Sequence, residues 1–271
     1  MSSVLTIAQY WDADEVPDYL QELIATFRDR NPEMEHRVFS ERTATEFIAE
    51  HVGEREAAAF RACAVPTMQS DYFRYCAVYV LGGVYADVGF RCLAPLGPML
   101  ERLGGGRVFR VQPPGYLLSG LFLYDVPGHP LPRLVIDVAT ANIERRASRL
   151  VQMVTGPWIL SGLSLLHRLG SLDGFRRDVA DRGIDTLLGP FCREAPTMAP
   201  TRAAGQAVPS MARPLFEAVG DYRRVEEAFE GVRITPYAMV KDWVREPSPS
   251  LPYKESDRYW INWQRERSIF R

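Results

Sequence analysis

An acid and a base lie three residues apart in an otherwise apolar segment, at Asp71 and Arg74. If the segment is helical, the two side chains share a face and can pair with each other or act together on a ligand. In the second case Asp71 accepts hydrogen bonds from a ribose or sugar hydroxyl, while Arg74 holds Asp71 or contacts phosphate. Charges are rare in buried helices unless they are paired or functional, so both interpretations stay open.

Asp87 ends a short apolar run, residues 84–88, that predicts a buried strand. In open α/β sheets, ligands bind in the crevice at the carboxyl ends of the strands. Transfer of a sugar from a nucleoside diphosphate leaves negative charge on the diphosphate, which a divalent cation with oxygen ligands usually neutralises. We therefore expect Asp87 to be a catalytic residue and a ligand of Mn²⁺ or Mg²⁺.

Alternating strands and helices are expected to position these residues. Apolar runs predict strands, and apolar residues spaced three or four apart predict helices. The predicted strands span residues 4–11, 36–39, 84–88, 107–111 and 120–124, and the predicted helices span residues 17–31, 43–51, 70–81, 131–146 and 158–169. This alternation is typical of an α/β fold with a mostly parallel central sheet flanked by helices.

The length of 271 residues predicts one domain. Residues 1–125 are expected to form the ligand-binding core, and residues 126–271 a helical and loop-rich part that binds the acceptor and closes over the site. The formal net charge of -2 provides no basic field, so nucleic-acid binding is not expected.

The four cysteines contain no Cys-x-x-Cys pair, which favours a reducing compartment and no structural zinc. No signal sequence and no long apolar span is evident, so we expect a cytoplasmic protein. A less favoured hypothesis is a peripheral enzyme of the inner membrane. In that case Arg145, Arg146 and Arg149, or the tail 265–271, would contact anionic lipid.

The central block resembles a known family. Ser70-Asp71-x-x-Arg74-Tyr75 followed by Gly82-Gly83-Val84-Tyr85-x-Asp87 is similar to the sugar-binding block of glycosyltransferase family 32, whose relatives include initiating mannosyltransferases and the glucosylating domains of large clostridial toxins. The resemblance covers most of the chain, although only this block is specific. Its other parts are Gln9-Tyr10-Trp11, Asn31-Pro32, Pro127-Gly128-His129-Pro130, Thr155-Gly156-Pro157 and Asn262-Trp263.

The resemblance implies a GT-A fold with a C-terminal lid, a UDP- or GDP-sugar donor and transfer with retention of anomeric configuration. It implies a hexosyltransferase of glycan or polysaccharide biosynthesis, whose acceptor is a hydroxyl of a glycan, a lipid-linked compound or a small molecule. It also implies that Asp71, Arg74 and Tyr85 bind the donor, and that Trp11 lies against the nucleotide base, although a core tryptophan is an equal alternative.

Gly89 departs from the family pattern, because it replaces the second aspartate of the Asp-x-Asp metal motif. One hypothesis is that Arg91, on the same side of a continuing strand as Asp87, neutralises the diphosphate directly. A second is that Asp257 and Asn262 supply replacement metal ligands. A third is a catalytically impaired sugar-nucleotide-binding protein or partner subunit. If the motif is aligned correctly, Gly89→Asp is expected to strengthen manganese binding.

Three further motifs each carry a structural alternative. Thr155 is expected to cap the helix after it, and it can also bind a sugar hydroxyl with the free amides there. Trp263 belongs to an aromatic tail that either closes on a sugar ring or packs against the core. Asp12 and Asp14 form a second Asp-x-Asp, which we interpret as capping residues and not as a metal site.

Overall fold

The protein is described by a computed structural model. It covers residues 5–103, 110–112, 116–118, 122–171, 173–174, 177, 215, 217–232, 242–245, 251–255, 259, 263–264 and 267–271.

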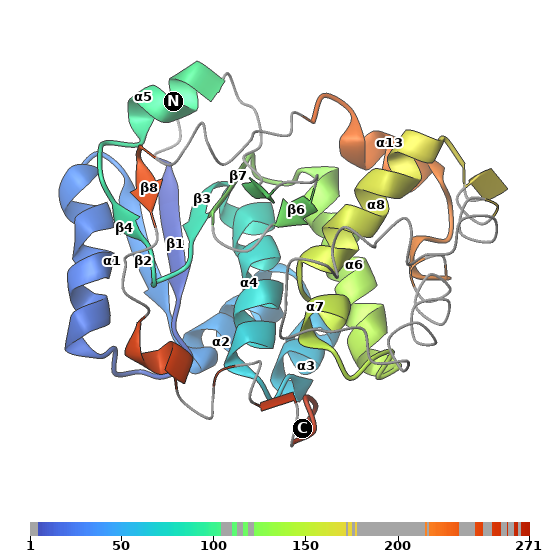
Figure 1. Ribbon diagram of the computed structural model, residues 1–271, viewed down its shortest axis with the longest axis horizontal. Helices are drawn as coiled ribbons and strands as arrows, with labels where there is room; N and C mark the ends of the chain where they lie inside the picture. The colour runs from blue at the N-terminus through green and yellow to red at the C-terminus, as the bar shows by residue number, and fades with distance from the viewer. Residues whose placement is uncertain are drawn as a thin grey trace.

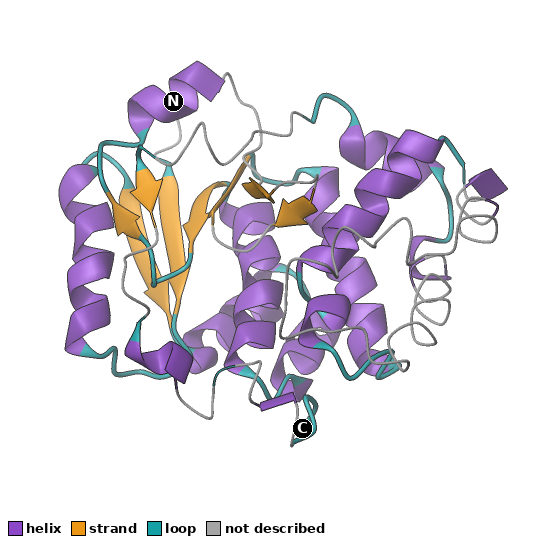
Figure 2. Ribbon diagram, in the orientation of Figure 1, coloured by secondary structure: helices purple, strands orange, loops and turns teal. Residues whose placement is uncertain are grey.

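The centre of the fold is a four-stranded sheet with strand order β2-β1-β3-β7 (Figures 1 and 2). Its strands are β1 (Thr6–Tyr10), β2 (Glu35–Phe39), β3 (Gly83–Ala86) and β7 (Phe122–Asp125). β1 runs parallel to both β2 and β3, whereas β7 pairs antiparallel with β3. The expected α/β class and the mostly parallel sheet are therefore confirmed, with one antiparallel edge strand.

Two small antiparallel ladders accompany this sheet in the described part of the chain. β4 (Arg91–Cys92) pairs with β8 (Val244–Arg245), and β5 (Arg110–Gln112) pairs with β6 (Tyr116–Leu118). The described helices are α1 (Asp18–Arg30), α2 (Glu41–His51), α3 (Glu54–Ala62), α4 (Pro66–Leu81), α5 (Gly97–Leu103), α6 (Pro130–Glu144), α7 (Val151–Val154), α8 (Pro157–Leu169), α13 (Arg223–Phe229) and the 3₁₀ helix η3 (Pro252–Glu255).

Both faces of the two central strands, β1 and β3, are buried, whereas the edge strand β2 is mostly exposed. Ile7 of β1 packs with Phe27 of α1 on one face. On the other face, Tyr10 packs against Phe73 of α4, with ring centroids 5.6 Å apart. Figure 1 shows the same arrangement, with α1 on one side of the sheet and α4 on the other. β1 and β3 consequently lack the polar alternation of a half-exposed sheet.

Helix α4 begins one turn earlier than the sequence suggested. Pro66 occupies its first turn, where a proline loses no helical hydrogen bond, and Val65 is the residue before it. Ser70, the first residue of the predicted helix, therefore lies inside the observed one. The pattern also missed α3, because its buried face consists largely of alanines, Ala57 and Ala59, around Phe60.

The turn from α4 into β3 depends on two glycines with left-handed backbone conformations. Gly82 and Gly83 have φ angles of 63° and 75°. A Cβ atom on Gly83 would lie 2.3 Å from the carbonyl oxygen of Thr6 in β1. Only glycine lets β3 approach β1 this closely, and this approach places Asp87 beside the end of β1.

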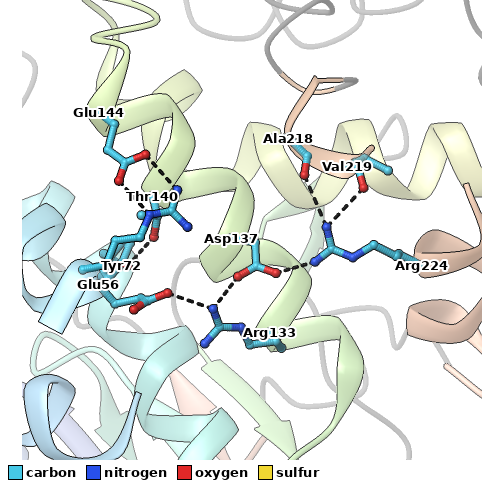
Figure 3. Close-up of polar contacts among 10 residues, drawn as sticks. Glu56, Tyr72, Arg133, Asp137, Thr140, Glu144, Ala218, Val219 and Arg224 are labelled. Carbon is cyan, nitrogen blue, oxygen red and sulfur yellow. Dashed lines mark hydrogen bonds and ion pairs between the residues drawn. The ribbon is translucent and has the colours of Figure 1, made fainter. Parts of the chain in front are cut away.

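A network of ion pairs joins the helices on the C-terminal side (Figure 3). Arg133 of α6 contacts Glu56 of α3 at 2.8 Å and Asp137, one turn along α6, at 2.5 Å. Arg224 of α13 binds the other oxygen of Asp137 and donates to the carbonyl oxygen of Val219 at 3.1 Å. Burial makes an unpaired Glu56 costly, so the network specifies how α3, α6 and α13 pack.

Two of the arginines considered for lipid contact, Arg145 and Arg146, have partners within the protein. Arg145 forms an ion pair with Glu217 at 3.0 Å. Arg146 donates to the carbonyl oxygen of Arg271 at 3.1 Å, and its guanidinium lies over the ring of Phe270. Within the described residues, no helix has both the length and the apolar character needed to cross a bilayer.

Gly83→Ala tests the close approach of β3 to β1. The added Cβ would meet backbone, so we expect the free energy of unfolding to fall by about 3 kcal/mol or more, measured by urea denaturation. Gly128→Ala is the matched control, since Gly128 has a φ of 73° but nothing within 4 Å of its added Cβ. It should cost only about 1–2 kcal/mol. Equal losses in both variants would show that the contact with Thr6 is not a constraint.

Candidate functional site

A cavity of about 240 Å³ lies at the carboxyl ends of β1 and β3. Trp11 and Asp12 follow β1, and Asp87 and Val88 follow β3, so the sheet brings residues from distant parts of the sequence together. The cavity is lined by Tyr10, Trp11, Asp12, Tyr19, Pro66, Thr67, Ser70, Arg74, Asp87, Val88, Tyr253 and Tyr259. The location agrees with the sequence expectation for a ligand site in an open α/β sheet.

One wall of the cavity is aromatic. The rings of Trp11 and Tyr253 meet edge to face, with centroids 5.9 Å apart, and Tyr259 lies 6.4 Å beyond Tyr253. The Trp11 indole donates to the carbonyl oxygen of Glu15 at 3.1 Å, which fixes the ring orientation. Such a wall offers apolar area to a planar base or to the apolar face of a sugar.

A second group of lining residues is polar, and Arg74 is its centre. The guanidinium bridges two carboxylates: it contacts Asp71 at 2.8 Å and Asp87 at 3.3 Å. It also donates to the hydroxyl of Ser70 at 3.2 Å, and Ser70 donates to Asp87 at 3.4 Å. Asp87 keeps about 23% of its side chain exposed, so it can present oxygen atoms to a ligand.

Asp71 and Tyr85 form a buried layer behind these polar residues. Neither residue lines the cavity; Asp71 is 4% exposed and Tyr85 is fully buried. The Tyr85 ring lies 5.5 Å from the Arg74 guanidinium carbon, and its hydroxyl is 3.2 Å from that of Ser70. In this structure the two residues expected to bind donor therefore orient the side chains that face the cavity.

Burial sets the protonation behaviour of this cluster. Desolvation raises the pKa of Asp71 from 3.8 to about 6; the positive charge of Arg74 opposes the shift, and the negative charge of Asp87 adds to it. Burial disfavours the charge of Arg74, but the carboxylates of Asp87 and Asp71 outweigh this effect and raise its pKa above the ordinary value. Arg74 is thus always a cation, while Asp71 retains a proton over part of the neutral range.

Thr155 lies behind Asp71. Its side chain is completely buried, and its hydroxyl lies close enough to the Asp71 carboxylate to lower the pKa of that group. Thr155 follows α7, and Gly156 is the residue that precedes α8. The expectation that Thr155 caps α8 is therefore wrong, and the residue instead supports the buried carboxylate.

Arg91 is separated from the cavity by a turn. β3 ends at Ala86, and the amide of Phe90 donates to the carbonyl oxygen of Asp87 at 3.0 Å, so the chain reverses there. The strand alternation that placed Arg91 beside Asp87 is broken by this turn. Arg91 is exposed in β4 and does not line the cavity, which removes the premise for its contact with the diphosphate.

The described residues do not fit a two-carboxylate metal site. Asp87 contributes one carboxylate, which already contacts the Arg74 guanidinium; the other carboxylate lining the cavity, Asp12, follows a different strand, and position 89 supplies none. No group of three or more His, Cys, Asp or Glu side chains capable of holding a metal occurs within the described ranges. The remaining proposed ligands, Asp257 and Asn262, lie outside the described residues, so that hypothesis stays a prediction.

Trp263, the other tryptophan expected at the donor site, packs against the main hydrophobic core. Its indole donates to the carbonyl oxygen of Ser268 at 2.9 Å, and the Arg267 guanidinium lies 4.9 Å from the ring centroid. Trp263 does not line the cavity. Of the two alternatives left open by the sequence, the structure agrees with core packing.

Asp12 and Tyr19 line the cavity but were not selected from the sequence. Asp12 was interpreted as a capping residue, whereas α1 starts after Pro17 without any side-chain cap. Asp12 follows β1 as Asp87 follows β3, and this shared position at a strand end was the available signal. Tyr19 gave no sequence signal for a role at the cavity, because an aromatic residue on an amphipathic helix is normally part of the core.

Comparison with known proteins agrees with a sugar-binding function for the first part of the chain. Residues 17–106 match the family model described as "Glycosyltransferase sugar-binding region containing DXD motif". The matched segment includes Ser70, Arg74, Asp87 and Gly89. The chain thus contains a glycosyltransferase-like sugar-binding region.

Two further comparisons complete this result. No curated protein matches the chain. Among solved structures, one described as "PaToxG Glycosyltransferase" is similar, with 14% sequence identity, a TM-score of 0.49 and coverage of 80% of this chain and 87% of that chain.

The pKa of Asp71 predicts a pH-dependent effect of Asp71→Asn on stability. The carboxyl binds its proton more tightly in the folded protein than at its ordinary pKa of 3.8, so its stabilising contribution is complete below that value and is lost as the pH rises through about 6. We expect the wild type to lose stability relative to Asp71→Asn between about pH 4 and pH 7, measured by urea denaturation. Asp29→Asn, at an exposed ion pair, should show no such trend; a flat difference for Asp71→Asn would contradict the raised pKa.

Proposed function

We propose that the chain is a retaining glycosyltransferase that binds a UDP- or GDP-sugar in this cavity and transfers the sugar to a hydroxyl acceptor. The observation that carries the proposal is the convergence of Ser70, Arg74 and Asp87 in a cavity that is also lined by aromatic residues. This convergence falls within the segment that matches the glycosyltransferase model.

The two groups of lining residues suit the two kinds of surface on a nucleotide sugar. The carboxylate of Asp87 accepts hydrogen bonds from sugar hydroxyls, and Arg74 and Ser70 offer donors beside it. The aromatic wall at Trp11 and Tyr253 takes the base or the apolar face of the sugar ring. Asp71 and Tyr85 act through Arg74 and Ser70, so we propose them as positioning residues.

The reaction we propose needs no protein nucleophile. The bond between the anomeric carbon and the diphosphate oxygen breaks, and the acceptor oxygen forms a bond to that carbon on the same face. The acceptor proton passes to the departing phosphate oxygen. The protein contributes by holding donor and acceptor in this arrangement and by directing polar groups at the developing charge.

The acceptor is assigned to the part of the chain that follows residue 125. Residues 1–125 supply most of the cavity, and we propose that the later residues position the acceptor, whose reactive group is a hydroxyl of a glycan, a lipid-linked compound or a small molecule. Hexosyl transfer in glycan or polysaccharide biosynthesis is the pathway class that the central block favours.

Gly89 supports a second candidate function, a protein that binds nucleotide sugar without efficient transfer. A missing second carboxylate weakens cation binding and with it the stabilisation of the departing diphosphate. The two candidates differ in turnover. Both predict that nucleotide sugar stabilises the protein, but only the enzyme releases UDP or GDP when acceptor, or water in its place, is present.

Thermal unfolding with a panel of nucleotide sugars tests whether the cavity is a donor site. UDP-glucose, UDP-N-acetylglucosamine and GDP-mannose should each be tried, and at least one should raise Tm, because a ligand that binds only the folded state stabilises it. Asp87→Asn keeps the side-chain size but removes the charge, so it should abolish the rise and any release of nucleotide. Asp29→Asn, an exposed site away from the cavity, is the control. If no nucleotide sugar raises Tm in the wild type, both candidate functions are wrong.

The two tryptophans provide a matched test of the binding wall. Trp11→Leu should weaken binding of the responding nucleotide sugar by about tenfold, roughly 1.4 kcal/mol, because it removes an aromatic face from the cavity. Trp263→Leu should leave Kd within about twofold, since its ring packs outside the cavity. Isothermal titration of both variants measures the difference. A larger loss of affinity in Trp263→Leu would place the donor elsewhere.

A further inference from the structure

The space above Gly89 is filled by side chains from the C-terminal part of the chain. A Cβ atom added at Gly89 would lie 3.0 Å from Leu251 Cδ1 and 3.1 Å from the hydroxyl oxygen of Tyr253. The φ of Gly89 lies outside the left-handed region, so its backbone does not require glycine. The neighbouring side chains therefore crowd a second carboxylate at this position, because they must shift to admit even a Cβ atom.

These side chains are firmly held. Residues 251–255, the C-terminal strap, contain η3, and Leu251 and Tyr253 pack on a cluster that includes Val88 and Leu20. The strap is preceded by β8, which pairs with β4 directly after the Asp87–Gly89 turn, and the amide of Leu93 donates to the carbonyl oxygen of Trp243 at 2.6 Å. In Figure 1, β8 lies beside β4. Two contacts separated along the chain thus fix the strap against the turn.

The charge near Asp87 also disfavours a divalent cation. The Arg74 guanidinium lies 3.3 Å from Asp87 Oδ1, and it repels a second cation at the same oxygen. The hydroxyl of Ser70 is directed at that oxygen as well, at 3.4 Å. Tyr253, which lines the cavity, brings a neutral hydroxyl that can both donate and accept hydrogen bonds but is a poor ligand for Mn²⁺ or Mg²⁺.

We propose that Tyr253 takes the place of the missing second carboxylate, and that nucleotide-sugar binding in this cavity does not require a divalent cation. The Tyr253 hydroxyl contacts the donor where a cation would otherwise bridge, and Arg74 supplies the positive charge. This inference rests on the proposed donor site.

The same geometry changes what Gly89→Asp should do. The sequence alone suggested that this substitution would strengthen manganese binding. In the structure its side chain must displace Leu251 or Tyr253 before it can reach a cation. Restoring the motif therefore requires two changes, a carboxylate at position 89 and removal of the Tyr253 side chain.

Binding with and without cation is the first experiment. The nucleotide sugar that stabilises the wild type should be titrated calorimetrically in buffer containing either Mn²⁺ or EDTA, and Kd should agree within about twofold between the two conditions. Binding that is lost or falls tenfold or more in EDTA overturns the inference and leaves the proposed function standing. No binding in either condition overturns both.

Tyr253→Phe tests the hydroxyl separately from the ring. It should weaken donor binding about threefold to tenfold in EDTA, since one hydrogen bond is lost while the aromatic wall remains. Tyr79→Phe is the matched control, because Tyr79 is a half-buried tyrosine of α4 that does not line the cavity, and it should bind donor as the wild type does. Equal affinity of Tyr253→Phe and wild type would show that the hydroxyl makes no donor contact.

Manganese binding, measured by electron paramagnetic resonance without any nucleotide, tests the occupied space. Gly89→Asp should bind Mn²⁺ no more than twofold better than the wild type, and Gly89→Asp with Tyr253→Ala should bind it at least tenfold better. Gly89→Ala and Tyr253→Ala alone are the controls for the added Cβ and the lost ring. Strong Mn²⁺ binding by Gly89→Asp alone, with an unchanged Tm, would contradict the proposed role of Tyr253.

Discussion

The buried guanidinium of Arg74 is the interaction on which the rest of the site depends. A cation that is 2% exposed would be prohibitively costly without compensation, and the protein supplies carboxylates on two sides. Asp71 comes from the same helix, whereas Asp87 comes from the end of a strand. The ion pairs therefore connect α4 to β3 and fix the position of Asp87 relative to the sheet. Any ligand that meets Asp87 meets a carboxylate that is already oriented.

This arrangement has an electrostatic consequence for the ligand. The three charged groups sum to a single negative charge when Asp71 is ionised and to none when it is protonated. Asp12 also lines the cavity, so a diphosphate meets a site of net negative charge in which Arg74 supplies the positive charge among the lining residues. Charge on a ligand is matched locally by Arg74 rather than by the general field of the protein, whose formal net charge is only -2.

Much of the fold could be predicted from the sequence, because strong periodic patterns determine it. The strands at residues 6–10 and 83–86 and the helix ending at Leu81 carry clear apolar patterns and a glycine stop. α3 was missed because alanines give a weak amphipathic signal. At the site, Asp87 was found from its place at a strand end, and Trp11 from the resemblance to the family. The position of Arg91 relative to Asp87 depends on a turn that a local pattern does not specify. The exact boundary between α7 and α8 is likewise not specified, so Thr155 was wrongly expected to cap α8.

The remaining site residues could not be predicted because they come from distant parts of the sequence. Tyr253 is 164 residues from Gly89 in the sequence. The local sequence around each residue does not predict that they are in contact. Asp12 was visible but was assigned a local role as a cap. Local sequence patterns predict helices and strands, but they do not predict contacts between residues that are far apart in the sequence. The complete lining of the cavity depends on such contacts.

The pairing of β4 with β8 determines when during synthesis the cavity is completed. β4 leaves the ribosome about 150 residues before β8, and the parallel sheet and its helices can already be collapsed at that stage. The aromatic wall formed by Tyr253 and Tyr259 is added only after this later segment has emerged. A nascent chain therefore has the polar half of the cavity but not its cover, so a prematurely terminated polypeptide would expose Trp11 and Val88 to water.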